Sequence, residues 1–369
     1  LPKLKVLTFH GPFRKMDLDR PYDLLLTSYG ILRNEGAWFD ENKFDVVVFD
    51  EVQAAKNHRS KLYAALEAVK GNVKVGLTGT PIENRLRELK TLFDLVLPGY
   101  MPHESDYRRC IVQPIERDGN AEQKGLLHRM TKPFVYRRLK KDVMSDLPAK
   151  TEEIAHCDLL PTQERLYRET LLERRDELMK DLLDNSKAVP YLHVFSLLSR
   201  LKQICDHPAL YFKTPADYKA HESGKWELFK ELLSEARESG QKVVVYSQYL
   251  GMLDIIENYL NEESVKFASL RGSTRDRREQ VEKFANDPAC EVFVASLKAA
   301  GLGIDLTKAS VVIHYDRWWN AARENQATDR VHRFGQNRGV QVFDVSQIDV
   351  AKGIQQLPLA SETAITPIG

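Results

Sequence analysis

The feature that most constrains the fold is an alternation of short, apolar, β-branched segments with longer segments of helical spacing. In the first third of the chain, candidate strands span 23–27, 44–49 and 73–77, and a helix is predicted over 61–70. Strands that are apolar along their whole length suit a sheet buried on both faces, and a strand–helix–strand order produces parallel pairing. The sequence therefore predicts an α/β protein.

The same alternation returns in the last third of the chain. Candidate strands there span 242–246, 266–270, 291–295, 310–314 and 340–343, and candidate helices span 252–260, 275–285 and 323–332. Residues 99–240 have mainly helical character, including the amphipathic segments 164–183 and 195–204. Residues 346–369 have few charges and no clear period, and we assign them no structure. Two open, mostly parallel sheets with helices between them are thus expected.

Composition narrows the class of protein. A chain of 369 residues with 43% hydrophobic and 29% charged residues can form two globular domains and does not have a disordered composition. No apolar run approaches the roughly 18–20 residues that a membrane-spanning helix needs. The net charge of +1 means that any surface for nucleic acid must be local.

The four cysteines form no C-x-x-C pair, so neither a zinc site nor a disulfide framework is predicted, and a reducing interior is the expected environment. The segment Cys205-Asp206-His207 lacks a second pair of ligands and is interpreted as structural.

Two adjacent carboxylates, Asp50 and Glu51, follow the apolar strand 44–49. Ligands of open α/β sheets bind at the carboxyl ends of strands, so this pair suits a magnesium–nucleotide site. One carboxylate can hold Mg²⁺ through water, and the other can orient and deprotonate an attacking water. An acidic loop without chemistry is the alternative, and the pair alone does not decide.

The turn Thr78-Gly79-Thr80 follows the strand 73–77 and leads into Pro81, a residue that the first turn of a helix tolerates. Glycine permits a sharp turn, and threonine hydroxyls can bond backbone, carboxylate or phosphate groups. Such a turn can link a nucleotide site to a neighbouring surface. Taken alone, it is equally an ordinary strand-to-helix turn.

Arg330 and Arg333 are three residues apart and share one face if their segment is helical. Two guanidinium groups presented together can clamp the charge that builds on a γ-phosphate during transfer. A salt-bridged helix surface is the alternative. Gly303 and Asp305 belong to an earlier segment, 296–306, whose small residues permit close approach to a nucleotide or polyanion.

Several polar residues lie directly after predicted strands, where their hydroxyl, amide and backbone groups would contact phosphates without selecting a base sequence. The candidates are Thr27, Ser28, Ser247, Gln248, Arg271, Gly272, Ser273, Thr274 and Lys298. Trp318 is either a nucleic-acid contact or a packing residue, and its type does not decide between them.

Several blocks of sequence occur in a characteristic order. They are DEVQAAKN (50–57), LTGTPIENRL (77–86), RRLKKDVMSDLPAK (137–150), LKAAGLGIDLT (297–307) and DRWWNAARENQATDRVHRFGQ (316–336). Together they resemble the Swi/Snf-type ATPases, the chromatin-remodelling branch of helicase superfamily two. The resemblance covers residues 3–345. It implies two RecA-like lobes, with ATP in the cleft between them and double-stranded DNA lying across both.

The resemblance also implies roles for single residues. Asp50 and Glu51 look like the pair that coordinates Mg²⁺ and activates water, and Arg330 and Arg333 look like arginine fingers. Cofactor binding would extend to Gly303, Asp305 and Gln326, and the residues that couple hydrolysis to movement would be Gln53, Thr78, Gly79 and Thr80. The expected domains are a partial first lobe with a helical insertion (1–136), a second lobe (137–345) with an insertion at about 160–215, and an unassigned tail (346–369).

The chain departs from the family pattern in three places. Val52 replaces the usual alanine, the match ends beyond Phe343, and no G-x-x-x-x-G-K-[ST] loop occurs. Ser223-Gly-Lys is the nearest sequence to that loop, but it lacks the upstream glycine. In the family the loop precedes the segment that corresponds to Leu1, so we expect a truncated first lobe that binds ATP poorly alone.

Three functions stay open at this point. The first is an ATP-dependent translocase on double-stranded DNA, the second a non-catalytic nucleic-acid-binding module, and the third a strand-separating DNA or RNA helicase. A nucleosome, RNA polymerase or another DNA-bound complex is the expected target. The expected compartment is intracellular, which means the cytoplasm in a bacterium or the nucleus in a eukaryote.

Overall fold

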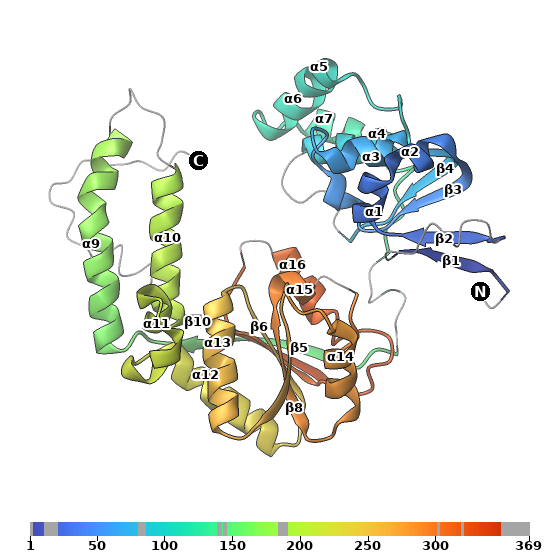
Figure 1. The fold of residues 1–369 in the computed structure, drawn as a ribbon. Helices are drawn as coiled ribbons and strands as arrows, with labels where there is room; N and C mark the ends of the chain where they lie inside the picture. The colour runs from blue at the N-terminus through green and yellow to red at the C-terminus, as the bar shows by residue number, and fades with distance from the viewer. Residues whose placement is uncertain are drawn as a thin grey trace. The chain divides into compact units, whose positions relative to one another are not determined.

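The computed structural model describes residues 3–10, 21–79, 86–138, 142, 146–183, 191–300, 303–318 and 321–347. The chain divides into two compact units, Leu1–Arg138 and Leu139–Gly369 (Figure 1). Every strand pair among the described residues is parallel. The predicted α/β class with parallel sheets is therefore confirmed. No helix in the described ranges is both long enough and apolar enough to cross a membrane.

The first unit contains two pairs of parallel strands. β1 (Val6–Phe9) pairs with β2 (Leu24–Thr27), and β3 (Lys43–Phe49) pairs with β4 (Lys70–Gly76). The helices of this part are α1 (Tyr29–Asn34), α2 (Gly36–Glu41), η2 (Val52–Ala55), α3 (Lys61–Ala68) and α4 (Leu86–Val96). One apolar core joins strands and helices, and Phe9 at the end of β1 and Phe49 at the end of β3 both pack in it.

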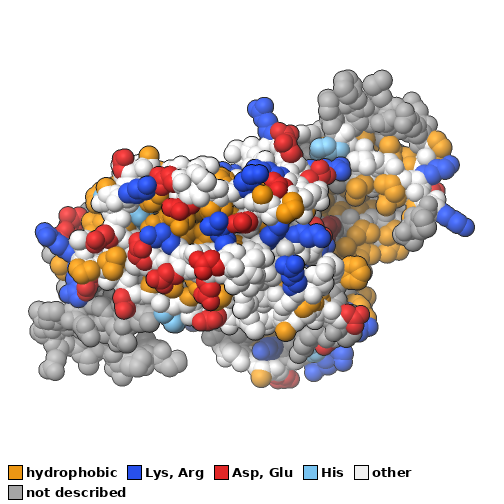
Figure 2. Space-filling model, turned by 90° about the horizontal axis from the view of Figure 1, so that it is seen from below, with side chains coloured by type: hydrophobic (Ala, Val, Ile, Leu, Met, Phe, Trp, Pro, Cys, Tyr) orange, Lys and Arg blue, Asp and Glu red, His pale blue; other side chains and the backbone are white. Residues whose placement is uncertain are grey.

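Only one face of the β3–β4 pair is covered within the described residues. Successive side chains of a strand point to opposite faces. Val47 therefore packs on the helices, whereas Val46, Val48 and Val73 are 58%, 54% and 53% exposed. Figure 2 shows hydrophobic side chains gathered on this unit. Parallel sheets are normally buried on both faces, so this apolar face needs a cover that the described residues do not supply.

A group of short helices completes the first unit around a core of its own. Tyr107 and Ile111 are fully buried there, and they pack with Phe93 of α4. The elements are α5 (Glu104–Tyr107), the π-helical turn η3 (Arg108–Val112), α6 (Gln113–Glu116) and α7 (Ala121–Thr131).

The second unit is built on a six-stranded parallel sheet with the order β5-β10-β9-β6-β8-β7. The strands are β5 (Lys150–Cys157), β6 (Val243–Ser247), β7 (Lys266–Leu270), β8 (Cys290–Ser296), β9 (Val311–His314) and β10 (Val340–Gln347). Residues of β6 and β9 are almost completely buried, as their unbroken apolar sequences predict.

Helices cover both faces of this sheet. One face packs on α12 (Gly224–Glu238) and α13 (Leu250–Glu262). The other packs on α14 (Arg277–Asn286), α15 (Leu297–Ala300) and α16 (Ala321–Thr328). Alternate residues of β6 enter the two cores, which fixes the position of the strand in the sheet.

A helical hairpin leaves the sheet between β5 and α12, within the predicted insertion. Its two long helices, α9 (Pro161–Leu183) and α10 (Tyr191–Asp206), lie side by side in Figure 1. Tyr167, Leu197 and Leu201 form their shared core. Two short elements, α11 (Pro208–Phe212) and η4 (Pro215–Ala220), return the chain to the sheet.

Two predictions of secondary structure are wrong. Residues 150–157 fall in the region predicted as mainly helical, but they form the edge strand β5, whose pairing partner β10 is distant in sequence. The helix predicted over 323–332 begins and ends earlier, as α16, so Arg330 and Arg333 lie beyond its end. β10 continues to Gln347, and the rest of the unassigned tail lies outside the described residues.

Candidate functional site

Asp50 and Glu51 follow β3 at the carboxyl edge of its sheet, as predicted. Asp50 is exposed and its Oδ1 accepts a hydrogen bond from the Glu51 amide at 3.0 Å. Glu51 is half-buried, and Gln53 Nε2 donates to its Oε2. The predicted coupling residue Gln53 therefore directly holds one of the two carboxylates.

The backbone of Glu51 is in the left-handed region, with φ 49° and ψ 47°. Few residues other than glycine, asparagine and aspartate adopt this conformation, because Cβ crowds the carbonyl. Strained residues of this kind persist where the surrounding structure enforces them, and they concentrate at functional sites. Here the enforcing contacts include the Val52 amide, which donates to the Leu77 carbonyl at 3.0 Å.

Tyr29 is a residue of this edge that sequence analysis missed. Its hydroxyl donates to the Asp50 carbonyl at 2.5 Å. Burial, together with the negative charges of Asp50 and Glu51, raises the pKa of Tyr29 to about 12, so the phenol stays a donor. The only signal in the sequence is its place directly after Thr27-Ser28.

The turn after β4 adjoins the acid pair. The Leu77 amide donates to the Phe49 carbonyl at 2.8 Å, which ties the start of this turn to the end of β3. Thr78 is half-buried and Gly79 is exposed. Thr80 lies outside the described residues.

The acid pair fits Mg²⁺ by its chemistry. Carboxylate oxygens are the ligands that this hard cation prefers, and it commonly keeps several waters when only one or two carboxylates hold it. Asp50 has the exposure that such a partly hydrated ion requires. No cluster of three or more histidine, cysteine or acidic side chains suited to a metal occurs in the described part of the chain. Among the described residues, a site here would therefore rest on these two carboxylates.

Arg330 and Arg333 lie in tight turns that follow α16. The buried Thr328 hydroxyl bonds His314 Nε2 at 2.8 Å, and the Arg330 carbonyl accepts from the Leu306 amide at 2.9 Å instead of extending the helix. These contacts explain why the predicted helical face does not form. Both arginines and Gln326 are half-buried.

The structure does bring the arginine segment and the small-residue segment together. Arg333 Nη1 donates to the Ile304 carbonyl at 3.3 Å, next to Gly303 and Asp305. Gly303 has φ 55°, the left-handed conformation that glycine adopts without strain. Asp305 is exposed, and its Oδ1 accepts from the Thr307 amide at 3.0 Å.

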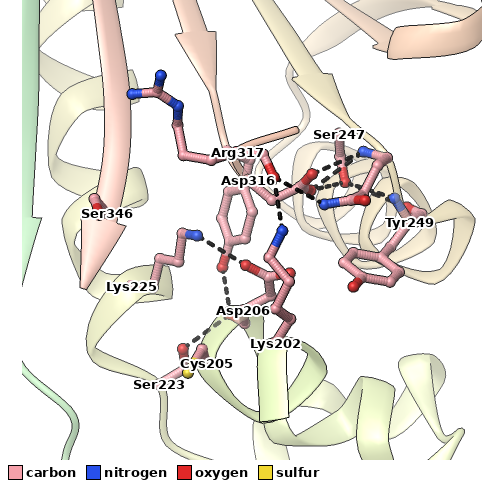
Figure 3. Close-up of polar contacts among 12 residues, drawn as sticks. Lys202, Cys205, Asp206, Ser223, Lys225, Ser247, Tyr249, Asp316, Arg317 and Ser346 are labelled. Atoms are coloured by element: carbon pink, nitrogen blue, oxygen red, sulfur yellow. Dashed lines mark hydrogen bonds and ion pairs between the residues drawn. The ribbon is translucent and has the colours of Figure 1, made fainter. Parts of the chain in front are cut away.

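Two of the predicted nucleic-acid contacts in the second unit have partners inside the protein (Figure 3). The Ser247 hydroxyl is fully buried and donates to Asp316 Oδ2. The backbone amide of Gln248 donates to both oxygens of the same carboxylate, at 3.0 and 3.2 Å. The side-chain Nε2 of Gln248 donates to the Arg317 carbonyl at 3.2 Å. Ser247 is thus a core residue in this structure.

Arg271 is also engaged within the second unit. Its guanidinium contacts Asp254 at 2.6 Å and Glu257 at 2.7 Å, both on α13. The next two predicted contacts, Gly272 and Ser273, are exposed. Arg277 steadies their turn, since its Nη2 donates to the Gly272 carbonyl at 3.1 Å.

Of the remaining predicted contacts, some are exposed and others have partners inside the protein. Lys298 is exposed at the carboxyl edge of the second sheet, and Trp318 is half-buried against one of its cores. In the first unit, the Thr27 hydroxyl donates to the Phe9 carbonyl at 3.0 Å. Ser28 caps α1 by accepting from the Ile31 amide at 3.4 Å.

A buried polar network lies at the carboxyl edge of the second sheet and was not predicted from the sequence. Lys225 and Asp206 form an ion pair at 2.8 Å, with side chains 6% and 4% exposed. Burial opposes the charge of Lys225, but the carboxylates of Asp206 and Asp316 outweigh it and raise its pKa. The Tyr315 hydroxyl donates to the Asp206 carbonyl at 2.7 Å. Figure 3 shows this network beside Ser247.

Two segments that the sequence analysis set aside supply this network. In Cys205-Asp206-His207, His207 caps α11 through Nδ1, which accepts from the Ala209 amide at 3.2 Å. In Ser223-Gly-Lys, a Cβ on Gly224 would lie 2.1 Å from the Asp158 carbonyl oxygen, so only glycine fits. Both segments have structural partners, and for Cys205-Asp206-His207 this agrees with the interpretation from sequence.

Comparison with known proteins identifies the family. The SNF2-related domain matches residues 1–210, and the helicase conserved C-terminal domain matches residues 224–335. A putative ATP-dependent helicase/translocase of Bacillus subtilis, YwqA, is 37% identical over 92% of this chain and 38% of its own length. The human SWI/SNF-related matrix-associated actin-dependent regulator of chromatin subfamily A member 1 is 31% identical over 93% of this chain and 34% of its own length.

The chain belongs to the SNF2-related family, as the sequence motifs indicated. The SWI2/SNF2 ATPase core of Sulfolobus solfataricus, solved in complex with dsDNA, is 33% identical, with a TM-score of 0.46 over 96% of this chain and 75% of that one. The chain spans about a third of the length of the curated relatives that it matches.

Proposed function

We propose that this chain forms the motor region of an ATP-dependent translocase on double-stranded DNA, with its two units as RecA-like lobes. The observation that carries the proposal is Glu51, a half-buried carboxylate held in a left-handed backbone beside the exposed Asp50. A strained carboxylate at the carboxyl end of a parallel strand suits a general base. The name of the Bacillus subtilis relative, an ATP-dependent helicase/translocase, supports ATP as the substrate.

The roles of the acid pair follow from its contacts. Asp50 would hold Mg²⁺ through water, and Glu51 would accept the proton of the attacking water. Mg²⁺, when bound, supplies positive charge that offsets the charge of the phosphate oxygens. Gln53 would orient the Glu51 carboxylate, since its amide already donates to it. Thr78, Gly79 and Thr80 would pass the state of this edge to the surrounding surface.

The arginine segment would act on the charge of the transferred phosphate. Arg330 and Arg333 would stabilise charge on the γ-phosphate, and Gln326, Gly303 and Asp305 would contact the nucleotide. The hydrogen bond from Arg333 to the Ile304 carbonyl supports a common role for the two segments, because it fixes one against the other.

Exposed groups at the carboxyl edge of the second sheet would contact the DNA backbone. Gly272, Ser273 and Lys298 are available there, and contacts of this kind position a protein without selecting a base sequence. One relative, MOT1 of Saccharomyces cerevisiae, is named as a TATA-binding protein-associated factor. We infer that the substrate of this chain is a protein–DNA complex that the motor remodels.

The test uses the product of the complete open reading frame that encodes this chain. Phosphate release is measured with and without blunt double-stranded DNA, and stimulation by the duplex is expected. Glu51→Gln should lower turnover by at least about 100-fold, because it removes the general base, while MgATP binding is retained. Glu41→Gln, at an exposed carboxylate of the same unit, is the matched control and should leave turnover unchanged.

Three results would overturn parts of this proposal. A lack of stimulation by the duplex would remove DNA as the activator. Robust displacement of one strand from a forked duplex would assign a strand-separating helicase. Retained DNA binding without any ATP hydrolysis would assign a non-catalytic module.

A further inference from the structure

Arg317 joins three elements of the second unit. It follows β9, next to Trp318, and its Nη2 lies 3.1 Å from Glu324 Oε2 on α16. Its Nη1 lies 2.6 Å from Asp344 Oδ2 on β10. One guanidinium group therefore connects the segment after β9, the helix before the arginines, and a neighbouring strand.

Glu324 receives bonds from two consecutive residues. Besides the guanidinium of Arg317, the Trp318 amide donates to Glu324 Oε1 at 2.5 Å. Glu324 is only 4% exposed. A buried carboxylate is tolerated only when charged or hydrogen-bonding partners satisfy it. The position of Trp318 and the position of α16 are thus tied to one carboxylate.

The main chain of Arg317 is held from the opposite direction. Lys202 of α10 donates to the Arg317 carbonyl at 2.8 Å, and Gln248, at the end of β6, donates to the same oxygen at 3.2 Å. In Figure 3 the guanidinium points away from these donors. The two ends of Arg317 therefore contact two different sets of elements.

These contacts fix the orientation of Arg317 more than they stabilise the fold. The Arg317 side chain is 40% exposed, and ion pairs of such exposure contribute little to folding. A planar guanidinium between two carboxylates nevertheless fixes direction, because its donors have a rigid fork geometry. The arrangement suits a residue that keeps two segments in register.

The Arg317–Glu324 pair lies between two groups of residues. Trp318 and Gln248 lie at the carboxyl edge of the second sheet, the edge that also carries Lys298, whereas α16 carries Gln326 and leads directly into Arg330. Arg317 and Glu324 connect the two through an ion pair, and the bond from the Trp318 amide to Glu324 runs beside it.

We propose that Arg317 and Glu324 are positioning residues that couple DNA binding to the arginine segment, an inference that rests on the proposed translocase function. When DNA contacts the segment after β9, a displacement there reaches α16 through the Arg317–Glu324 pair and the bond from Trp318. The pair touches neither substrate in this account. Its loss uncouples hydrolysis from DNA and leaves both binding steps in place.

The experiment compares Arg317→Met and Glu324→Gln with wild type in the full reading-frame product. Turnover of ATP is measured without DNA and at saturating blunt duplex, and duplex affinity is measured by fluorescence anisotropy. The ratio of stimulated to basal turnover should fall by about 10-fold, within the range typical of coupling between sites. Duplex affinity should change by less than about 3-fold on the same scale. The double variant should be no worse than either single variant, because the two residues act as one pair.

Matched controls separate coupling from damage to the fold. Arg237 and Glu291 form a comparable pair at 2.6 Å at the amino-terminal edge of the same sheet. Arg237→Met and Glu291→Gln should leave the stimulation ratio unchanged. Arg317→Lys, which keeps the charge, should restore part of the ratio and serves if Arg317→Met does not fold.

Each remaining outcome counts against the inference. An unchanged ratio in the Arg317 and Glu324 variants would overturn it, as would an equal fall of basal and stimulated turnover. If wild type itself is not stimulated by duplex DNA, the proposed function fails first, and that result is distinguishable because it precedes any variant.

Discussion

Replacing the buried Asp316 by asparagine should change how the stability of the second unit depends on pH. Asp316 is 1% exposed and accepts hydrogen bonds from the Ser247 hydroxyl and the Gln248 amide. Burial, followed by the charge of Asp206, raises the pKa of Asp316 to about 7, although Lys225 and the two hydrogen bonds partly offset this rise. Asparagine has nearly the same shape but cannot ionise, so it isolates the charge.

The sign follows from the two pKa values of Asp316. The folded value of about 7 exceeds the ordinary value of 3.8, so folding takes up a proton between these limits. The stabilising contribution is complete below pH 3.8 and is lost as the pH rises through 7. Integrating this linkage between pH 5 and pH 8 gives a loss of about 2–3 kcal/mol in wild type that the asparagine variant does not show.

Other groups act in the opposite direction, so the comparison must be between variants. Burial lowers the pKa of His207 and His314 to about 4, and their contributions are present above pH 6.5 and lost as the pH falls through 4. They are common to both proteins and cancel in the difference. Urea unfolding followed by tryptophan fluorescence, with the buried Trp226 as a probe of this unit, supplies the free energies.

The stability of Asp316→Asn relative to wild type should therefore increase by about 2–3 kcal/mol from pH 5 to pH 8. A difference that stays constant over this range, within about 0.5 kcal/mol, would refute the argument that Asp316 is ionised at a cost.

Two further predictions concern lysines of the second unit. Lys225→Met should destabilise this unit by about 3–5 kcal/mol, because Asp206 would remain buried without its partner. The control Arg278→Met, at an exposed ion pair, should leave the unfolding midpoint unchanged. A loss below about 1 kcal/mol for Lys225→Met would contradict the stabilising role of the buried ion pair. Lys298→Gln should weaken duplex binding and reduce the slope of log affinity against log salt by about one. The control Lys266→Gln, at the amino-terminal end of β7, should change neither. Equal slopes for wild type and both variants would exclude Lys298 as a phosphate contact.

The elements that could be predicted from sequence are those whose environment is uniform along the strand. β6 has an unbroken apolar run and is buried on both faces, and its predicted and observed bounds differ by one residue at each end. β5 could not be found in this way. Residues of β5 are mostly exposed, and the strand exists because its backbone pairs with β10, nearly two hundred residues away. An edge strand of this kind has no local apolar signal.

The candidate site shows the same division. The acid pair was predicted because a strand and the two residues after it are adjacent in sequence. The fate of Arg271 was not, because the carboxylates that bind it, Asp254 and Glu257, lie on the preceding helix α13. Sequence identified a basic residue at the end of a strand but could not show that its charge was already matched.

At the carboxyl edge of the second sheet, polar residues of similar type therefore have different uses. Ser247 ends β6 and Ser273 comes shortly after β7, and both carry a hydroxyl, yet the first is buried against Asp316 and the second is exposed. The buried hydroxyl and its carboxylate fix where β6 and β9 end, and this fixes the direction in which Arg317 leaves the sheet. An edge that must transmit a contact needs such a rigid base, because a displacement at a compliant edge would be absorbed locally. If the proposed coupling holds, the buried network would give the exposed residues of this edge a fixed frame.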